Sequence, residues 1–562
     1  MKDLDGKKIC MGTLFSQEYF FRVPEYQRPF SWEPDNFEDL IDDLLSANHQ
    51  QEYFLGTIVL HKRNEQNDYD IVDGQQRITS IMVLLACLRD IAGNQEYKKG
   101  IQDKIVQPRN VVDGIQEKKR LTVRDWKIFK DLIITENGTK ESRKIHDLPE
   151  PECRYYNAIS IFNERLKGLK ENEIEDIINF LSQKCVIISL ATSTFDDAFR
   201  LFTIVNDRGK QLRRIDILKS LNLAPDVITN ESIRTRVAQE WEDHEKDLTG
   251  STFESIFHLI RLIFLKDKPQ GDLLKEFDDR IFSKGHILKG ETFFNCAFDY
   301  VLLYKKIFIE KDIMSSTDEN HNKFKSLIHI MNREFVASEW RACILYFAKK
   351  FKGANIYPFC LLIEKVYLSH WVKAMRKDER YSDYSRILVL ISNSKKSEDV
   401  LVNISYDNTS KNDKGLPTII YDSNEIIKSA KNNNFYNVGY CKYFLLRLEL
   451  LTAEHDSLHE YSPASIEHVL PQTPNATGYW AEKHDLSNIN EYVNKLGNLV
   501  LLSKGKNSSA KNFDFEKKKE KYLKDRVSDY PRSIQVLSFS EWTKEVIEER
   551  TSEAAANILN DL

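Results

Sequence analysis

Hydrophobic residues in the first part of the chain form both strand-like runs and a helix-like segment. Residues 53–60 and 69–72 predict two buried strands joined as a hairpin. The apolar stretch 78–88 predicts a buried helix, and the β-branched run 185–190 is typical of a further buried strand. We therefore expect an α/β domain that closes near Leu223, with its last strand returning to the first sheet.

The remainder of the chain changes from helical spacing to a second set of short strands. Between 226 and about 396, apolar residues recur mostly three or four positions apart, which predicts one helix after another. A polar stretch at 403–434 marks a boundary. An apolar helix at 440–451, a short strand that ends at Glu467 and His468, a second strand that opens on Asn498 and a lysine-rich helix follow. The expected class is α+β multidomain, with an N-terminal domain at 1–225, a helical connector at 226–430 and a C-terminal domain at 431–562.

Composition narrows the range of partners. A net charge of −5 over 562 residues excludes a uniformly basic nucleic-acid coat, so any DNA contact must come from local patches. The eight cysteines form no C-x-x-C pair, which indicates reduced thiols in a cytoplasm, with neither a disulfide framework nor a zinc ribbon. The first residues are charged, and no run of ~18 apolar residues occurs, so we expect neither a signal peptide nor a membrane span.

Candidate catalytic and metal-binding residues lie on or next to the two predicted C-terminal strands. Glu467 and His468 lie on the first strand and Asn498 opens the second, while a polar turn carries Asn507. Cutting a phosphodiester requires a base that activates water and a hard cation held by oxygen ligands, and these residue types can supply both. A lone histidine after a strand is also compatible with a structural role. The lysines that follow, Lys511, Lys517, Lys518 and Lys521, are either a solvated helix face or, beside such a centre, phosphate contacts.

A second candidate site lies at the start of the predicted N-terminal helix. The run Asp73-Gly74-Gln75-Gln76-Arg77 joins a strand to that helix, where free backbone N–H groups and the positive end of the helix dipole favour an anion. The alternative is a capped helix with Arg77 paired to Asp73. No G-x-x-x-x-G-K-[ST] run occurs, so any nucleotide chemistry is not of the P-loop kind.

These motifs resemble two domains of one enzyme family. Glu-His-Val-Leu-Pro-Gln at 467–472, Leu-Gly-Asn-Leu at 496–499 and the downstream Asn507 resemble the HNH, or ββα-metal, nuclease domain of GmrSD-type (type IV) modification-dependent restriction enzymes. The run Val-Pro-Glu-Tyr-Gln-Arg-Pro-Phe-Ser-Trp at 23–32, the Asp-Gly-Gln-Gln-Arg run and the segment 202–212 resemble their ParB-like N-terminal domain.

The resemblance implies a role for each matching residue. His468 would be the general base, Asn498 would brace the histidine loop, and Glu467 and Asn507 would bind a divalent metal, with Mg²⁺ expected and Mn²⁺ an option. Other HNH subfamilies often have His where this chain has Asn507. The nucleotide, whether ATP, GTP or UTP, would be bound by Tyr26, Gln27, Arg28, Asp73, Gly74, Gln75, Gln76, Arg77, Asn206 and Arg208.

The function that the resemblance implies is cleavage of modified double-stranded DNA in antiviral defence, coupled to NTP binding or hydrolysis. The connector could house a dimer face, giving a homodimer, or a pocket for a modified base. Two alternatives stay open. One is a nucleotide-regulated DNA-binding NTPase with a vestigial nuclease domain, and the other is a toxin-like nuclease that acts on unmodified nucleic acid.

Overall fold

The computed structural model describes residues 4–63, 67–141, 148, 150–194, 197–198, 201–202, 213–405, 419–461, 464–503, 513–520 and 530–562. The chain divides into two compact units, Met1–Glu240 and Trp241–Leu562, and each unit is described by itself.

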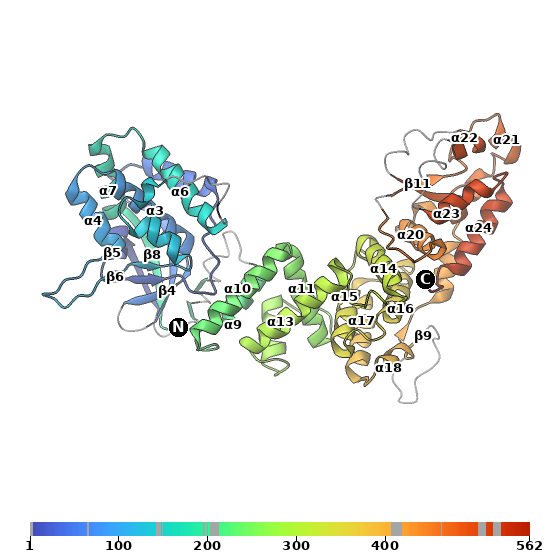
Figure 1. Ribbon diagram of the computed structural model, residues 1–562, viewed down its shortest axis with the longest axis horizontal. Coiled ribbons are helices and arrows are strands. Elements are labelled where there is room, and N and C mark those ends of the chain that lie inside the picture. The colour runs from blue at the N-terminus through green and yellow to red at the C-terminus, as the bar shows by residue number, and fades with distance from the viewer. Residues whose placement is uncertain are drawn as a thin grey trace. The chain divides into compact units, whose positions relative to one another are not determined.

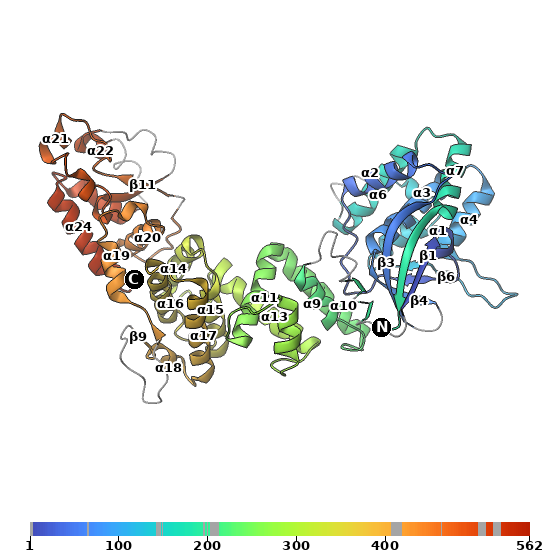
Figure 2. The same cartoon turned by 180° about the vertical axis from the view of Figure 1, so that it is seen from behind.

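A six-stranded mixed sheet organises the first unit (Figure 1). Its elements are, in order, β1 (Asp5–Cys10), α1 (Met11–Leu14), β2 (Phe20–Arg22), α2 (Pro34–Ser46), β3 (Tyr53–Lys62), β4 (Asp68–Asp73), α3 (Gln75–Ile91), α4 (Gln95–Ile105), β5 (Val106–Gln107), β6 (Lys118–Lys119), β7 (Leu121–Thr122), α5 (Trp126–Phe129), α6 (Glu150–Leu166), α7 (Glu171–Gln183), β8 (Cys185–Thr192), α9 (Arg214–Asn222) and α10 (Glu231–Asp247). The strand order is β1-β8-β3-β4-β2-β7. Strands β3 and β4 pair as an antiparallel hairpin, and β8 returns to lie parallel to β3 (Figure 2).

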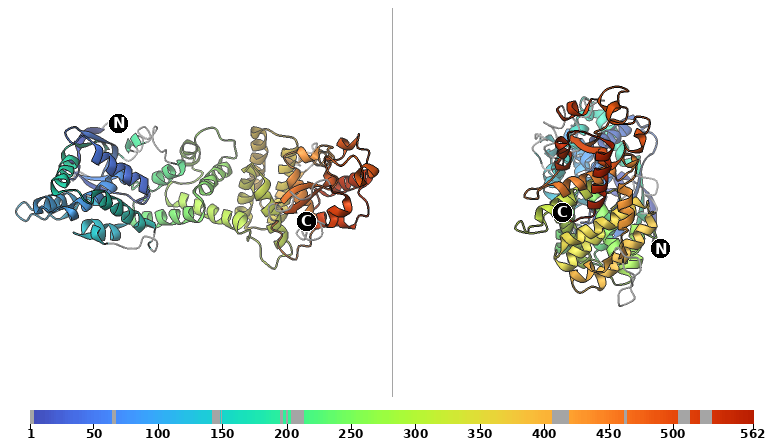
Figure 3. Two further views of the ribbon diagram at one scale, coloured as in Figure 1. Left: turned by 90° about the horizontal axis from the view of Figure 1, so that it is seen from above. Right: turned by 90° about the vertical axis from the view of Figure 1, so that its right-hand side faces the viewer.

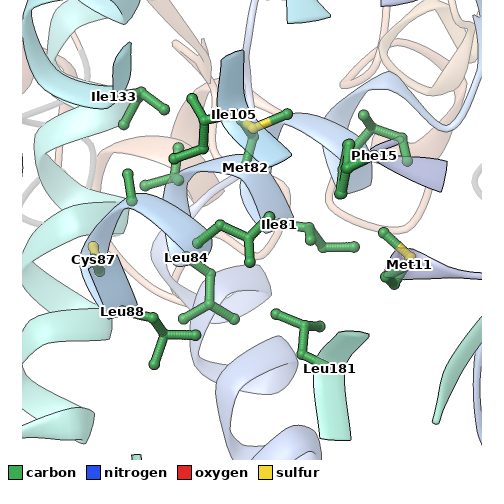
Figure 4. Packing of buried hydrophobic residues seen from close by; sticks show 14 of the residues in the cluster. Met11, Phe15, Ile81, Met82, Leu84, Cys87, Leu88, Ile105, Ile133 and Leu181 are labelled. Carbon is green, nitrogen blue, oxygen red and sulfur yellow. The ribbon is translucent and has the colours of Figure 1, made fainter. Parts of the chain in front are cut away.

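Helix α3 is the central helix of this unit. It is apolar on nearly all sides and buried from Ile78 to Leu88, and it packs against α4 and α6. A helix that is hydrophobic all round has to be enclosed. Figure 4 shows Ile81, Met82 and Leu84 of α3 within the core, together with residues that include Met11 of α1, Ile105 of α4 and Leu181 of α7. Burial of these side chains fixes the point at which α3 begins relative to the sheet.

Gly74 makes the turn from β4 into α3. Its φ of 91° lies in the left-handed region, and a Cβ there would lie 2.6 Å from Cγ2 of Ile58. Only glycine combines that backbone conformation with so close an approach to the neighbouring strand.

Helices dominate the second unit, and two short strands lie near its C-terminal end (Figure 3). After α10 its elements are α11 (Gly250–Leu265), α12 (Leu273–Glu276), α13 (Glu291–Tyr304), α14 (His321–Glu334), α15 (Glu339–Phe351), α16 (Ile356–Val372), α17 (Lys377–Asn393), α18 (Ser397–Leu401), β9 (Ile404–Ser405), β10 (Ile419–Ile420), α19 (Ser423–Ala430), α20 (Cys441–Thr452), β11 (Ala464–His468), α21 (Tyr479–Lys483), β12 (Leu499–Ser503), α22 (Phe515–Lys518), α23 (Pro531–Ile534) and α24 (Lys544–Asn557). Helices α11, α15 and α17 pack in series, α20 packs against α14, and both α20 and α23 pack against β12.

The structure confirms the α+β class and the predicted N-terminal hairpin with its returning strand. The predicted boundaries at 225/226 and 430/431 stay predictions. Within the described part of the chain, no single helix is long and apolar enough to cross a membrane, although the bent pair α10 and α11 meets the length and composition requirement when taken together.

Candidate functional site

The candidate C-terminal centre is built on the antiparallel pair β11 and β12. Glu467 lies opposite Val500 and His468 lies opposite Leu499. The two strands therefore bring the acidic residue and the histidine next to the segment that begins at Asn498, as the sequence predicts.

A short hydrogen-bond chain fixes the imidazole of His468. Its Nε2 lies 2.9 Å from Oδ1 of Asn494, and that oxygen also accepts from Nε2 of Gln472 at 3.0 Å. The amide Nδ2 of Asn494 donates to Oδ1 of Asn434 at 3.3 Å. Because the Asn494 oxygen is an acceptor, Nε2 of His468 must donate, and in the neutral imidazole Nδ1 is then the basic nitrogen.

Burial keeps His468 in its neutral form. The residue is 8% exposed, and burial together with the nearby Lys518 charge lowers its pKa to about 4, against the opposing effect of the Asn494 hydrogen bond. The ring of Tyr436 meets the imidazole edge to face, with 4.5 Å between ring centroids. At neutral pH this histidine is therefore uncharged, which is the form that a general base requires.

A buried ammonium marks a place for positive charge beside the histidine. Nζ of Lys518 donates to Oε1 of Glu467 at 3.1 Å and to the backbone oxygen of His468 at 2.7 Å. Lys518 is 0% exposed, and burial lowers its pKa, while the Glu467 carboxylate opposes that shift. The Glu467 carboxylate and the His468 carbonyl thus accept hydrogen bonds from a cation. Hard divalent ions also use oxygen ligands of this kind, so Glu467 fits the metal role that the resemblance implies.

Asn498 braces the loop that follows His468. Its Oδ1 accepts from the amide of Leu470 at 2.8 Å and from Nε1 of Trp542 at 2.9 Å. Its Nδ2 donates to the backbone oxygens of Leu470 at 2.9 Å and Val493 at 2.7 Å. The side chain is fully buried, so it acts on the histidine through the backbone rather than by touching a substrate.

Helix α24 holds the Asn498 segment from the other side. The amide of Gly497 donates to Oγ1 of Thr551 at 3.0 Å, and Nε of Arg550 donates to the Gly497 oxygen at 3.2 Å. A Cβ at Gly497 would lie 2.1 Å from the backbone oxygen of Ile547. The glycine therefore allows α24 to contact the chain directly, and this contact positions Asn498.

The predicted phosphate-binding lysines differ in their surroundings. Lys517 is exposed, with its Nζ 4.4 Å from the centroid of the Phe513 ring. Lys518, by contrast, is buried, because it lies one helical turn after the buried Phe515 and shares its inward face. Lys511 and Lys521, like the predicted metal ligand Asn507, lie outside the described residues.

The N-terminal motifs come together at the start of α3. Nε2 of Gln75 donates to the Arg28 oxygen and Nε2 of Gln76 to the Pro29 oxygen, each at 3.0 Å, and Oε1 of Gln76 accepts from the amide of Ser31 at 2.9 Å. Nε2 of Gln27 donates to the backbone oxygen of Val72 at 2.7 Å. The amides of both motifs thus hold the 26–31 loop on the helix N-terminus.

Basic groups surround this junction. Arg28 is paired with Asp216, which follows the third motif, and its side chain is 45% exposed. Nη1 of Arg77 donates to the Thr57 oxygen at 3.2 Å, and burial lowers its pKa, while the Asp73 charge opposes that shift. Nη1 of Arg124, which the sequence motifs do not include, donates to the Gln27 oxygen at 3.0 Å.

A narrow cavity at the same junction is lined by residues that include Arg28, Gln75, Gln76, Arg124 and Tyr155. Tyr26 precedes the lining residue Arg28 by two positions. It is buried, and burial raises the pKa of its hydroxyl well above the usual range. Asn206 and Arg208 lie outside the described residues.

One observation limits the metal binding that the described residues can provide alone. No group of three or more His, Cys, Asp or Glu side chains that could bind a metal occurs among the residues that the structure describes. A metal at Glu467 would therefore need further ligands, and the sequence offers Asn507.

Comparison with known families covers both ends of the chain. Residues 11–223 match the family described as "GmrSD restriction endonuclease, N-terminal domain", and residues 421–556 match "GmrSD restriction endonucleases, C-terminal domain". No curated protein gives a significant match. The two matches together include both sites, in the order expected from the sequence motifs. The chain therefore belongs to the GmrSD-type family of restriction endonucleases.

Proposed function

We propose that this restriction endonuclease is a metal-dependent HNH enzyme that cleaves modified double-stranded DNA and that its N-terminal, ParB-like unit couples cleavage to NTP binding or hydrolysis. The observation that carries the nuclease chemistry is the neutral, oriented His468, which lies beside the carboxylate of Glu467 and is held by Asn494 and Asn498.

Each protein group has a separate role in the hydrolysis. Nδ1 of His468 takes a proton from the attacking water, while Asn494 keeps the opposite ring nitrogen protonated and the ring in orientation. The water oxygen then forms the new bond to phosphorus, and the bond to the leaving oxygen breaks. Glu467, completed by Asn507, would hold Mg²⁺, or Mn²⁺ in its place, and a divalent ion there neutralises charge on the phosphate and leaving oxygen. Of the two lysines of this set that the structure describes, Lys517 is exposed and available for phosphate contact.

The N-terminal part of the proposal is supported by the convergence of its motifs. Arg28, Arg77 and Arg124 lie around the junction where α3 begins, and an NTP carries the phosphate charge that such a junction attracts. The glutamine amides already bond to the 26–31 loop, so we expect their part to be fixing this loop rather than contacting phosphate.

The decisive substrate experiment compares matched DNAs with and without cytosine modification, using Mg²⁺ or Mn²⁺, with and without each NTP. Cleavage confined to modified DNA, and altered by one NTP, is the expected result. Equal cleavage of all DNAs would replace the proposal with a toxin-like nuclease. NTP turnover with no cleavage in any condition would instead favour a regulatory NTPase that carries a vestigial nuclease domain.

A further inference from the structure

A cavity far along the sequence from both motif sets lies over helix α16. Its volume is about 370 Å³, and its lining includes Tyr367, His370, Trp371 and Ala374. Tyr367, His370 and Trp371 follow the i, i+3, i+4 spacing of one face of α16, and Ala374 lies in the turn that follows the helix. One face of α16 and its C-terminal end therefore form the floor.

The aromatic part of this floor is rigid. Tyr367 stacks on Phe335 with 3.7 Å between centroids and 5° between ring planes, and Trp371 stands at 84° to Tyr367. Trp371 is half-buried, so part of its ring faces open space. Flat apolar surfaces of this kind bind planar rings, because stacking needs no sequence-specific hydrogen bond.

Polar groups of the lining are under-bonded in the described part of the chain. His370 is 2% exposed and its Nε2 lies 2.9 Å from Oδ2 of Asp383, but its Nδ1 is buried without a hydrogen-bond partner there. Nη1 of Arg380 bonds to the Met375 oxygen at 3.0 Å, whereas its buried Nε has no partner there. Buried polar atoms in folded proteins are nearly always satisfied, so a partner is expected at such positions.

A helix C-cap turns the chain at the end of α16. Ala374 has a φ of 48°, the left-handed conformation that commonly ends a helix, and the amides of Ala374 and Met375 donate to the backbone oxygens of Trp371 at 3.1 Å and His370 at 3.0 Å. This turn carries the chain from α16 to Met375 and Arg380, which also line the cavity.

Segment 434–440 connects the cavity to the candidate catalytic histidine. On the cavity side, the ring of Tyr440 lies 6.2 Å from Trp371 and 5.9 Å from Phe435. On the catalytic side, the backbone amide of Tyr436 donates to the backbone oxygen of Asn494 at 3.0 Å. Asn434 accepts from the Asn494 side chain, and the Tyr436 ring contacts His468. One short segment thus touches the cavity wall and the groups that orient the imidazole.

We propose that the cavity over α16 binds a nucleobase ring and that segment 434–440 transmits its occupancy to His468. Trp371 supplies the stacking surface, and the partly exposed Arg380 side chain in the lining is available for the polar edge of the base. The base comes either from a free nucleoside or from a nucleotide extruded from DNA. The inference rests on the proposed function only in naming DNA as one of these sources.

Photocross-linking tests the site directly in the full chain carrying His468→Ala, so that no cleavage is needed. The probes are 5-iodouridine and a DNA duplex with one 5-iodouracil. We expect cross-links within 336–380, centred on Trp371 or Tyr367, with either or both probes; the nucleoside alone would identify a free ligand, and the duplex alone would identify an extruded base.

Two variants block the site in different ways, and one variant serves as a control. Trp371→Ala removes the stacking surface and should weaken probe binding by about 5- to 150-fold. Ala337→Trp fills the cavity from its rim and should abolish the cross-link without removing a core side chain. Leu302→Ala alters a separate cavity of about 390 Å³ on α13 and should leave the cross-link unchanged.

Three results would overturn the proposal. The first is that neither probe cross-links within 336–380. The second is that Ala337→Trp leaves the cross-link unchanged, and the third is that Leu302→Ala loses as much of the cross-link as the cavity variants do. Hydrogen exchange tests transmission, since probe binding should slow amide exchange in 434–440 in the parent but not in Trp371→Ala. Unchanged exchange with an intact cross-link refutes the transmission. Because these readouts use no cleavage, failure of the nuclease proposal alone would leave them unaffected.

Discussion

Replacing Asn498 by alanine tests whether this buried amide holds the loop after His468. The substitution removes four hydrogen bonds of 2.7–2.9 Å at once. It leaves two groups of Leu470, the Val493 oxygen and Nε1 of Trp542 without their partner, and all three residues are buried. The backbone after His468 then keeps only contacts such as the bond from the Val469 amide to the backbone oxygen of residue 498 at 3.0 Å.

The expected cost follows from the number of groups left unpaired. A buried polar group that loses its partner costs about 1–3 kcal/mol, so four such groups give at least about 4 kcal/mol. The lower end is the better estimate, because water can enter the space left by the amide. Since 1.4 kcal/mol corresponds to a factor of ten, the Leu470 amide should exchange up to about 10³-fold faster with solvent deuterium.

Hydrogen–deuterium exchange of the peptide that contains Leu470 measures this effect, and chemical denaturation reports the accompanying loss of stability. Asn424→Ala is a matched control, because that asparagine is exposed in α19. If Asn498→Ala exchanged at Leu470 within about threefold of the parent and unfolded at the same denaturant concentration, the bracing role would be refuted.

Three further predictions concern other parts of the second unit. Gly497→Ala places a Cβ 2.1 Å from a backbone oxygen of α24, so we expect a lower thermal midpoint and loss of DNA cleavage together; a variant that keeps both would show that α24 can move away without consequence. In Asn494→Leu the imidazole of His468 loses its hydrogen-bond acceptor, so the rate of single-turnover cleavage should fall by more than about tenfold. DNA binding measured by anisotropy should stay within about twofold of the parent. An unchanged cleavage rate would refute the positioning role of Asn494. Burial raises the pKa of Glu276, but its hydrogen bonds from arginine lower it more, so its stabilising effect is present above about pH 4.5 and is lost as pH falls through the lowered pKa. Glu276→Gln should therefore be about 3–5 kcal/mol less stable at pH 7, and this gap should narrow as the pH falls below about 4.5, whereas the exposed Asp378→Asn should change little; a gap independent of pH would refute the assignment.

Local sequence patterns predicted the elements that carry their own signal. Residues 53–60 and 69–72 lie in β3 and β4 because apolar runs bounded by turn residues specify buried strands. The Asp-Gly-Gln-Gln-Arg run lies at the turn into α3, where Gly74 is required by its backbone conformation and by Ile58. The pairing of the two short strands was equally predictable, because apolar residues on either side of His468 and after Asn498 mark both strands; Asn498 itself lies in the turn that leads into β12.

Contacts between distant segments could not be read from the sequence. The inward orientation of Lys518 depends on which face of α22 meets the strands, and a run of lysines gives no information on that face. Asn494 precedes Asn498 by four residues, but its bond to His468 spans 26 positions and has no sequence signature. The glutamine amides of the N-terminal motif were expected at an anion pocket, yet they bond to backbone atoms about 47 positions away.

The most direct measurement of the central claim is single-turnover cleavage of DNA in the presence of Mg²⁺ by the parent, His468→Ala and His459→Ala. His459 lies in the same unit, and its Nε2 lies 2.6 Å from the Glu454 oxygen, outside the proposed centre. The account predicts that His468→Ala loses about 10²- to 10⁴-fold in rate with DNA binding retained, as expected for loss of a general base, and that His459→Ala cleaves like the parent. Cleavage by His468→Ala at the parent rate would contradict the account.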